Sequence, residues 1–246
     1  MSQTEYITIP VSDGTSMRAF VARPEGKPHA GLLVFQEAFG VNAHIRDVTA
    51  RFAREGYLAI APELFHRTGP GFEGSYTDFA AIMPHFKGLT DAGLEADIRA
   101  SFDWLQHSEA FGLPISAVGY CMGGRTACLA GLVVPLACTI SYYGGGIAPS
   151  QFFPGLLDRL KELRAPILLV WGGKDQHIGP EQVQAVTGVL RSAGKAYVNV
   201  EFSDADHGFF CDARASYNPV AVAQAWPLTL AFLKSHEGAS ARKADA

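Results

Sequence analysis

The sequence predicts an α/β fold, with a mostly parallel central sheet and helices on both of its faces. Short, continuous apolar runs recur along the chain, and such runs are typical of strands that are buried on both faces of a parallel sheet. Segments with apolar residues at helical spacing stand between these runs. The alternation of the two patterns favours a parallel sheet that is covered by helices.

The first half of the chain opens with a hairpin signal at Asp13-Gly14, between two extended segments. Three elements are expected next: a buried strand over residues 30–36, an amphipathic helix over residues 43–55 that ends at Gly56, and a buried strand over residues 57–61. The stretch that follows, residues 62–79, is rich in glycine and proline and predicts a surface loop.

The second half continues the alternation. The expected strands are residues 115–120, two runs within 136–146 and 166–175 that end in glycine-rich loops, and residues 196–202. The expected helices are residues 93–108, 180–194 and 219–236, the last with a break or kink near Pro227. No repeat or linker divides the chain, so we expect one domain over residues 1–236. The small, polar residues 237–246 predict a disordered tail.

The composition argues against several classes of partner and of protein. The formal net charge is -4, and the 20 lysines and arginines are scattered, which argues against nucleic acid or an anionic membrane as a partner. No signal-peptide pattern and no apolar run of about 18 residues is present. Four cysteines without a CxxC pair fit neither a disulfide scaffold nor a zinc knuckle. We therefore expect a cytoplasmic protein, monomeric or a small homo-oligomer, that needs no metal or organic cofactor.

Reactive side chains follow four of the predicted strands. They are Glu37, Cys121, Asp175 and His207. Because ligands of α/β sheets bind at the carboxyl ends of the strands, these side chains are expected to converge on one edge of the sheet.

The pattern around Cys121, Gly-x-Cys-x-Gly between a strand and a helix, is that of a nucleophile elbow with cysteine in place of serine. The turn is tight, so small residues must flank the nucleophile, and Gly119 and Gly123 do so. The same turn aims the backbone N–H of Met122 at the reacting carbonyl oxygen. The order nucleophile, acid, histidine along the chain is that of the α/β-hydrolase fold.

Each residue also has a plainer interpretation. Cys121 alone could be a buried thiol in a strand-to-helix turn, since free cysteines are often buried. Asp175 alone could be a turn residue or a helix cap, and His207 an ordinary histidine. It is the joint arrangement of the three that indicates catalysis.

The sequence resembles the dienelactone hydrolases (carboxymethylenebutenolidases) over roughly residues 6–234. The motifs that carry the resemblance are "QEAFGVN", "GYCMGG", "WGGKD" and "DADHGF", in that order. The resemblance implies a compact α/β-hydrolase fold with a Cys-His-Asp triad. Cys121 would then be the nucleophile, His207 the base and Asp175 the acid that orients it.

The resemblance also implies roles for the residues after the first core strand. Glu37 would lie beside the thiol of Cys121 in the resting enzyme and help it to ionise once substrate is bound. Ala38 would supply the second oxyanion N–H, next to that of Met122. The plain alternative for Glu37 is an ion pair with an arginine at the sheet edge.

One motif departs from the family. Dienelactone-opening enzymes hold the substrate carboxylate with arginines, one of them shortly after the catalytic histidine, where this chain has "HGFFCDAR". Neutral esters and lactones are therefore expected to react about as well as carboxylated ones. The candidate substrate-binding residues are Gln36, Tyr143, Arg67 and Phe210.

These features predict hydrolysis of a small-molecule ester or lactone through an acyl-enzyme on Cys121. Two alternatives use the same scaffold: a non-catalytic binding protein and a thiol redox sensor. The sensor would need a resolving cysteine, and Cys128 stands seven residues away in the following helix.

Overall fold

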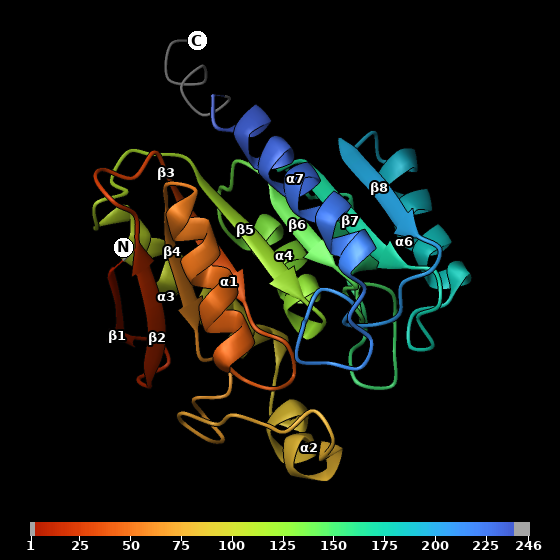
Figure 1. Cartoon of the computed structure of the whole chain (residues 1–246), viewed down its shortest axis with the longest axis horizontal. Helices are drawn as coiled ribbons and strands as arrows, with labels where there is room; N and C mark the ends of the chain where they lie inside the picture. The colour runs from red at the N-terminus through yellow and green to blue at the C-terminus, as the bar shows by residue number, and fades with distance from the viewer. Residues whose placement is uncertain (1–2, 239–246) are drawn as a thin grey trace. The chain divides into compact units, whose positions relative to one another are not determined.

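The computed structural model describes residues 3–238 (Figure 1). The chain divides into two compact units, Met1–Ala117 and Val118–Ala246. Each unit is described by itself. The expectation of one domain over residues 1–236 stays a prediction, and residues 239–246 of the predicted tail lie outside the described residues. Among the described residues, no helix is long and apolar enough to cross a membrane.

The strands are β1 (Gln3–Pro10), β2 (Ser16–Arg23), β3 (Ala30–Phe35), β4 (Tyr57–Pro62), β5 (Ile115–Tyr120), β6 (Thr139–Tyr142), β7 (Ile167–Gly172) and β8 (Tyr197–Phe202). The strand order is β1-β2-β4-β3-β5-β6-β7-β8. The pairs β1–β2 and β2–β4 are antiparallel, whereas β3–β4, β6–β7 and β7–β8 are parallel. The predicted α/β class and its mostly parallel sheet are confirmed.

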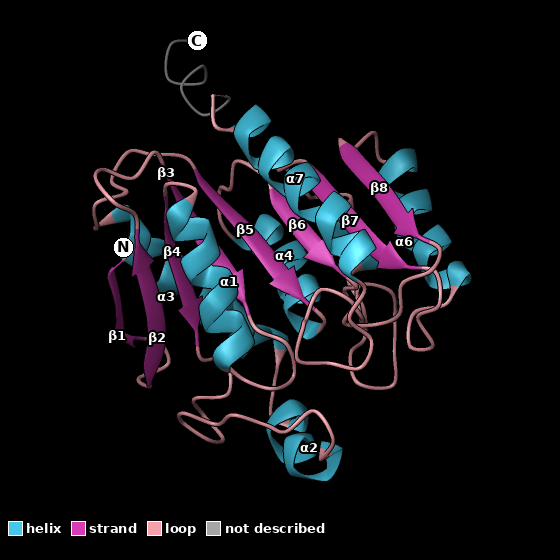
Figure 2. Cartoon of the chain, in the orientation of Figure 1, coloured by secondary structure: helices cyan, strands magenta, loops and turns pink. Residues whose placement is uncertain are grey.

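The helices are α1 (Ala43–Arg54), α2 (Phe79–Lys87), α3 (Asp91–Gln106), α4 (Met122–Val133), α5 (Leu157–Leu160), α6 (Pro180–Ser192) and α7 (Pro219–His236), shown in cyan in Figure 2. In the first unit α1 packs against β4, and in the second unit α4 packs against β6. Every residue of β3, β4, β5, β6 and β7 is buried, as expected for strands with both faces covered.

Local signals explain how these elements begin and end. The side chain of Asn42 accepts a hydrogen bond from the backbone N–H of Ile45 and so caps α1. Helix α1 is followed by Gly56, whose φ of 98° lies in the left-handed region that glycine adopts without strain.

Two expectations need correction. The stretch after β4 was predicted to be a surface loop. Residues 67–78 form such a loop, but residues 62–66 are buried. Two hydrogen bonds contribute to this burial: Nε2 of His66 lies 3.0 Å from Oδ1 of the buried Asp97 of α3, and the N–H of Leu64 donates to the side chain of the buried Gln36 at 3.0 Å. The break expected near Pro227 is also wrong, because α7 continues through it and a proline removes only one backbone N–H donor from this 18-residue helix. The alternative, a kink at Pro227, stays a prediction.

Candidate active site

Cys121 is the single residue between the end of β5 and the start of α4. Its φ of 57° and ψ of -123° form a conformation that costs a non-glycine residue about 1–3 kcal/mol. The backbone on both sides holds it there. The N–H of Cys121 donates to the carbonyl oxygen of Tyr142 at 3.1 Å, and its carbonyl accepts from the N–H of Gly124 at 2.9 Å.

Gly119 makes this turn possible. A Cβ atom at position 119 would lie 1.8 Å from the carbonyl oxygen of Gly123, well inside van der Waals contact. The small residue predicted before the elbow is therefore required by a backbone oxygen, which cannot rotate away as a side chain can. The side chain of Cys121 is partly exposed, whereas Cys128, Cys138 and Cys211 are buried and all four are free thiols.

Asp175 and His207 lie in the loops after β7 and β8, in the same unit as Cys121. The Nδ1 atom of His207 is 2.8 Å from Oδ2 of Asp175. The other carboxylate oxygen of Asp175 accepts from the backbone N–H groups of His177 at 2.8 Å and Ile178 at 3.1 Å. Both oxygens of the acid are thus held, and this fixes the orientation of the His207 ring.

The contacts between these groups lower the pKa of Asp175 and raise the pKa of His207. Burial would raise the pKa of Asp175, but the hydrogen bonds from His207 and from the two backbone N–H groups outweigh it and lower that pKa. Burial would lower the pKa of His207. The charge and hydrogen bond of Cys121, together with those of Asp175, outweigh this and raise the pKa of His207 to about 10. The imidazole of His207 therefore holds a proton more tightly than a free histidine does, and the charge of Cys121 is the largest of the causes that raise its pKa.

The profile of the Dienelactone hydrolase family matches residues 17–237. The chain belongs to the dienelactone hydrolase family. A relative from Escherichia coli, named "Putative carboxymethylenebutenolidase", is 34% identical over 242 residues, with 95% of this chain and 87% of that protein covered. A relative of the same name from Synechocystis is 34% identical over 235 residues, covering 91% and 93%.

Solved structures agree with this assignment. The crystal structure named as a putative dienelactone hydrolase from Klebsiella pneumoniae is 32% identical, covers 94% of this chain and 98% of its own, and has a TM-score of 0.86. The esterase Pf2001 from Pyrococcus furiosus is 16% identical with a TM-score of 0.72, and covers 96% of this chain and 92% of its own. The second likeness shows the fold alone. The α/β-hydrolase fold expected from the resemblance is confirmed.

In this dienelactone hydrolase family member, Met122 is the first residue of α4 and is buried. The first N–H groups of a helix have no carbonyl one turn earlier to bond, and the helix dipole gives this end a partial positive charge. The backbone N–H of Met122 is therefore suited to receive a developing oxyanion from an acyl group on the adjacent Cys121.

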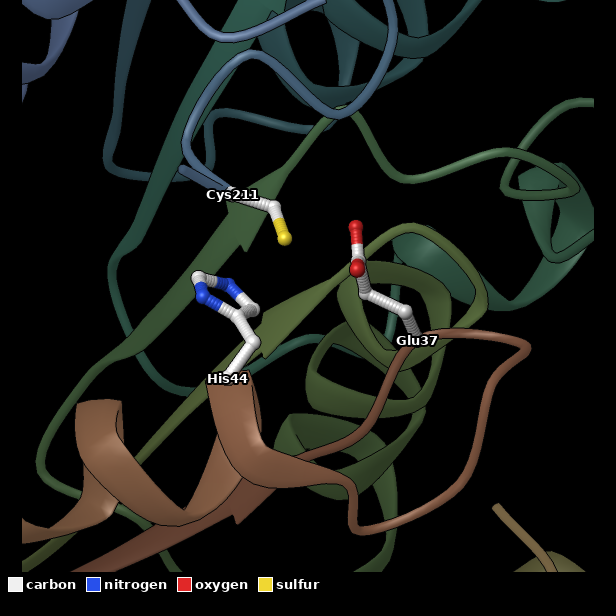
Figure 3. A group of neighbouring side chains, drawn as sticks. All are labelled: Glu37, His44 and Cys211. Carbon is white, nitrogen blue, oxygen red and sulfur yellow. The ribbon is translucent and has the colours of Figure 1, made fainter. Parts of the chain in front are cut away.

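Glu37 and Ala38 belong to the first unit, in the loop after β3, and both are buried. Figure 3 shows Glu37 on this loop and His44 at the start of α1; Cys211, also labelled there, belongs to the second unit. A carboxylate oxygen of Glu37 and a ring nitrogen of the buried His44 lie within 4.8 Å of each other. Within its own unit, Glu37 thus has a histidine beside it, a neighbour that the sequence analysis did not anticipate.

The four candidate substrate-binding residues divide into two groups. Gln36 donates to the carbonyl of Glu37 at 3.2 Å and accepts from the N–H of Leu64 at 3.0 Å, so its amide joins two loops. The guanidinium of Arg67 hydrogen bonds to Asp97 at 2.8 and 2.9 Å and to Asp13 at 2.7 Å.

Phe210 is buried, with its ring 5.2 Å from that of Tyr120 and 5.0 Å from that of Tyr142. These contacts give Gln36, Arg67 and Phe210 partners within the protein, and a role of the three in substrate binding stays a prediction. Tyr143 differs from them. It has a φ of 37°, and its ring lies 5.1 Å from that of His207.

Sequence reasoning missed one further side chain at this site. The ring of His177 lies 5.2 Å from the ring of His207 at an interplanar angle of 83°. The available signal was its position two residues after the predicted acid, in a loop already assigned to the site.

Proposed function

We propose that this protein hydrolyses esters or lactones of small molecules with Cys121 as nucleophile, His207 as base and Asp175 as the orienting acid. One observation carries the proposal: a partly exposed thiol on a strained strand-to-helix turn is coupled to an imidazole whose Nδ1 is 2.8 Å from a buried carboxylate. An unperturbed thiol has a pKa of about 8.5 and needs such a base at neutral pH.

The proposed reaction has two halves. His207 accepts the proton of Cys121, and the thiolate attacks the acyl carbon to give a tetrahedral oxyanion. The carbon–oxygen bond of the ester then breaks, the leaving alkoxide takes the proton from His207, and a thioester on Cys121 remains. Water attacks the thioester while His207 accepts its proton, the carbon–sulfur bond breaks, and the acid product and free Cys121 are released.

Backbone N–H groups would hold the oxyanion. We propose Met122 as one donor, which its place at the start of α4 supports, and Ala38 as the second, which the family resemblance supports. Loss of one such donor typically lowers the rate by about 10²-fold or more. We further propose that Glu37 restrains the resting thiol of Cys121 and assists its ionisation when substrate is bound.

The proposed substrates include neutral esters and lactones. No arginine directly follows His207, where the family motif is expected to have one, and Arg67 is already bound to two carboxylates. Arg214 comes later in the sequence, with its guanidinium against Gly208, and it is the cation that the comparison of carboxylated and methyl-capped lactones tests. A bidentate arginine–carboxylate contact is hard to replace by other means.

The test is a panel of p-nitrophenyl esters and paired lactones, carboxylated and methyl-capped, assayed with wild type and Cys121→Ala. We expect turnover in the wild type that falls by at least about 10³-fold in the folded variant. The two members of each lactone pair should have kcat/KM values within about tenfold of each other. Near-normal turnover by folded Cys121→Ala would remove the nucleophile, and absence of turnover by the wild type would favour the non-catalytic alternative.

A further inference from the structure

Arg125 is a buried charged side chain that the proposed reaction does not use. It lies in α4, four residues after Cys121, and none of its surface is exposed to solvent. A guanidinium keeps its charge in a protein, and moving a charge out of water is unfavourable unless partners compensate for the lost solvent. An apolar side chain would fill this position in the helix without that cost, so the charge itself indicates a role.

The guanidinium of Arg125 holds the end of the turn that follows β6. Its Nε donates to the carbonyl oxygen of Gly146 at 3.0 Å, and its Cζ lies over the ring of Phe153, 4.4 Å from the ring centre. Gly146 has a φ of 87°, and a Cβ atom there would lie 2.8 Å from Phe153 and 3.1 Å from Cδ of Arg125. Arg125 and Phe153 therefore enclose Gly146 closely and fix its position.

The same turn begins beside the base of the proposed triad. Its first residue, Tyr143, is fully buried and has a φ of 37°, which is uncommon for a residue with a side chain. The ring of Tyr143 lies 5.1 Å from that of His207, and its N–H donates to the carbonyl oxygen of Val170 at 2.7 Å. A strained conformation of this kind persists only where the surrounding structure holds it.

The middle of the turn lies close to the loop of the proposed acid. A Cβ atom on Gly145 would lie 3.9 Å from Cδ1 of Ile178, an ordinary van der Waals distance. The backbone N–H of Ile178 donates to Oδ1 of Asp175 at 3.1 Å. On its other side the turn meets α4, since a Cβ atom on Gly144 would lie 3.0 Å from the backbone of Gly124. The turn is therefore close both to the helix that follows the nucleophile and to the loop that carries the acid.

We propose that Arg125 is a positioning residue of the triad: by holding Gly146, it keeps the turn over residues 143–146 in place against His207 and against the loop of Asp175. The inference rests on the proposed function, because the groups that the turn orders are those of the proposed triad. Without the guanidinium, the turn can relax from its strained start. A displacement of about 1 Å at reacting groups can lower the rate about 10²-fold.

The first experiment measures ester turnover. Arg125→Met removes the charge and the donor, and Arg125→Lys keeps the charge but lacks the planar guanidinium with its Nε–H. With p-nitrophenyl acetate at pH 8, we expect kcat to fall at least about tenfold in Arg125→Met and less in Arg125→Lys, with KM within about threefold of wild type. The control is Arg191→Met, at an exposed arginine in the last turn of α6, and its kcat should stay within about twofold of wild type.

A second readout separates positioning from a loss of stability. In protein with 13C-labelled histidine, the NMR signals of the His207 ring are assigned by their absence from His207→Gln. A change in the stability of a two-state protein alters the folded fraction and leaves the signals of the folded state in place, whereas movement of the Tyr143 ring shifts the signals of His207. We expect these signals to move in both Arg125 variants and to stay in place in Arg191→Met.

Two results would overturn the inference. One is a kcat of Arg125→Met within about twofold of wild type. The other is a set of His207 signals that stays in place in the folded variants, which would assign Arg125 to stability alone. If Arg125→Met does not fold, Arg125→Lys and Phe153→Leu, which removes the ring under the guanidinium, give the same readouts. If wild type hydrolyses no ester, the proposed function fails, and the His207 signals still decide the inference.

Discussion

At the scale of single residues, Cys121 keeps its strained conformation because the residues around it are small. The closest approach in the turn is between position 119 and the carbonyl oxygen of Gly123. A methyl group at position 119 would have to displace this backbone, so the turn and the start of α4 would shift together. The elbow therefore depends on Gly119 as much as on the nucleophile that it presents.

We expect Gly119→Ala to lower the free energy of unfolding by more than about 3 kcal/mol, because the added Cβ would lie 1.8 Å from a backbone oxygen. Urea denaturation at pH 7 measures this change. The matched control is Gly188→Ala in α6, where a Cβ atom meets nothing within 4 Å. That change should stabilise the protein by about 0.5–1 kcal/mol, since alanine favours a helix interior over glycine. Equal stability of the two variants would contradict the steric account of the elbow.

The pair of Cys121 and His207 also predicts how stability depends on pH. Against the opposing effect of burial, Cys121 and Asp175 raise the pKa of His207 from 6.5 to about 10 in the folded state. The folded state therefore binds this proton more tightly than the unfolded chain does. The stability that the proton contributes is full below about pH 6.5 and is lost as the pH rises towards 10.

We expect the unfolding free energy of wild type, relative to that of His207→Gln, to decline between about pH 6.5 and 10, by up to about 1.4 kcal/mol per pH unit. Chemical denaturation at several pH values measures this difference. In a Cys121→Ser background the decline should become shallower, because the first of the causes that raise the pKa is removed. A difference that does not vary with pH would show that His207 is not held as an imidazolium in the folded protein.

At the scale of elements, α7 is tied to β6 by a buried hydroxyl group. The hydroxyl of Tyr142 donates to the carbonyl oxygen of Ala225 at 3.1 Å and lies 2.7 Å from Oγ1 of Thr229. Tyr142 is fully buried and Thr229 is buried as well. The strand that ends beside the elbow is thus joined to the C-terminal helix by polar contacts as well as by apolar packing.

We expect Tyr142→Phe to lower the unfolding free energy by about 1–2 kcal/mol, because the change leaves two buried polar groups with one partner fewer. A double-mutant cycle with Thr229→Val should show coupling between the two positions. Tyr217→Phe, at a tyrosine that is 39% exposed, is the control and should change stability by less than about 0.5 kcal/mol. Unchanged stability in Tyr142→Phe would mean that apolar packing alone holds α7.

Elements with strong local signals could be predicted, and those that depend on distant partners could not. The buried strands and the elbow follow from runs of apolar residues and from fixed glycines. The burial of residues 62–66 involves partners that are far away in the sequence, such as Asp97 for His66 and Gln36 for Leu64. The contact of His177 with His207 likewise depends on how two loops meet, and no spacing rule encodes it. For the same reason the structural contacts of Gln36, Arg67 and Phe210 were not anticipated.

At the scale of the whole molecule, Glu37 belongs to the first unit and Cys121 to the second. The restraint that we propose for the Glu37 carboxylate would follow from the repulsion between two negative charges. We expect Glu37→Gln to make Cys121 react faster with iodoacetamide at pH 7, without a matching rise in ester turnover. Alkylation that is unchanged or slower in the variant would favour the plain ion-pair interpretation of Glu37.

The most direct test of the account is to trap the acyl group on Cys121. Wild-type protein is mixed with a slowly hydrolysed p-nitrophenyl ester, quenched in acid within the first turnovers, digested and analysed by peptide mass spectrometry. We expect an acyl group on the peptide that contains Cys121, formed as fast as the burst of p-nitrophenol, and absent from Cys121→Ala. Turnover with the acyl group on a different residue, or with undiminished rate in folded Cys121→Ala, would contradict it.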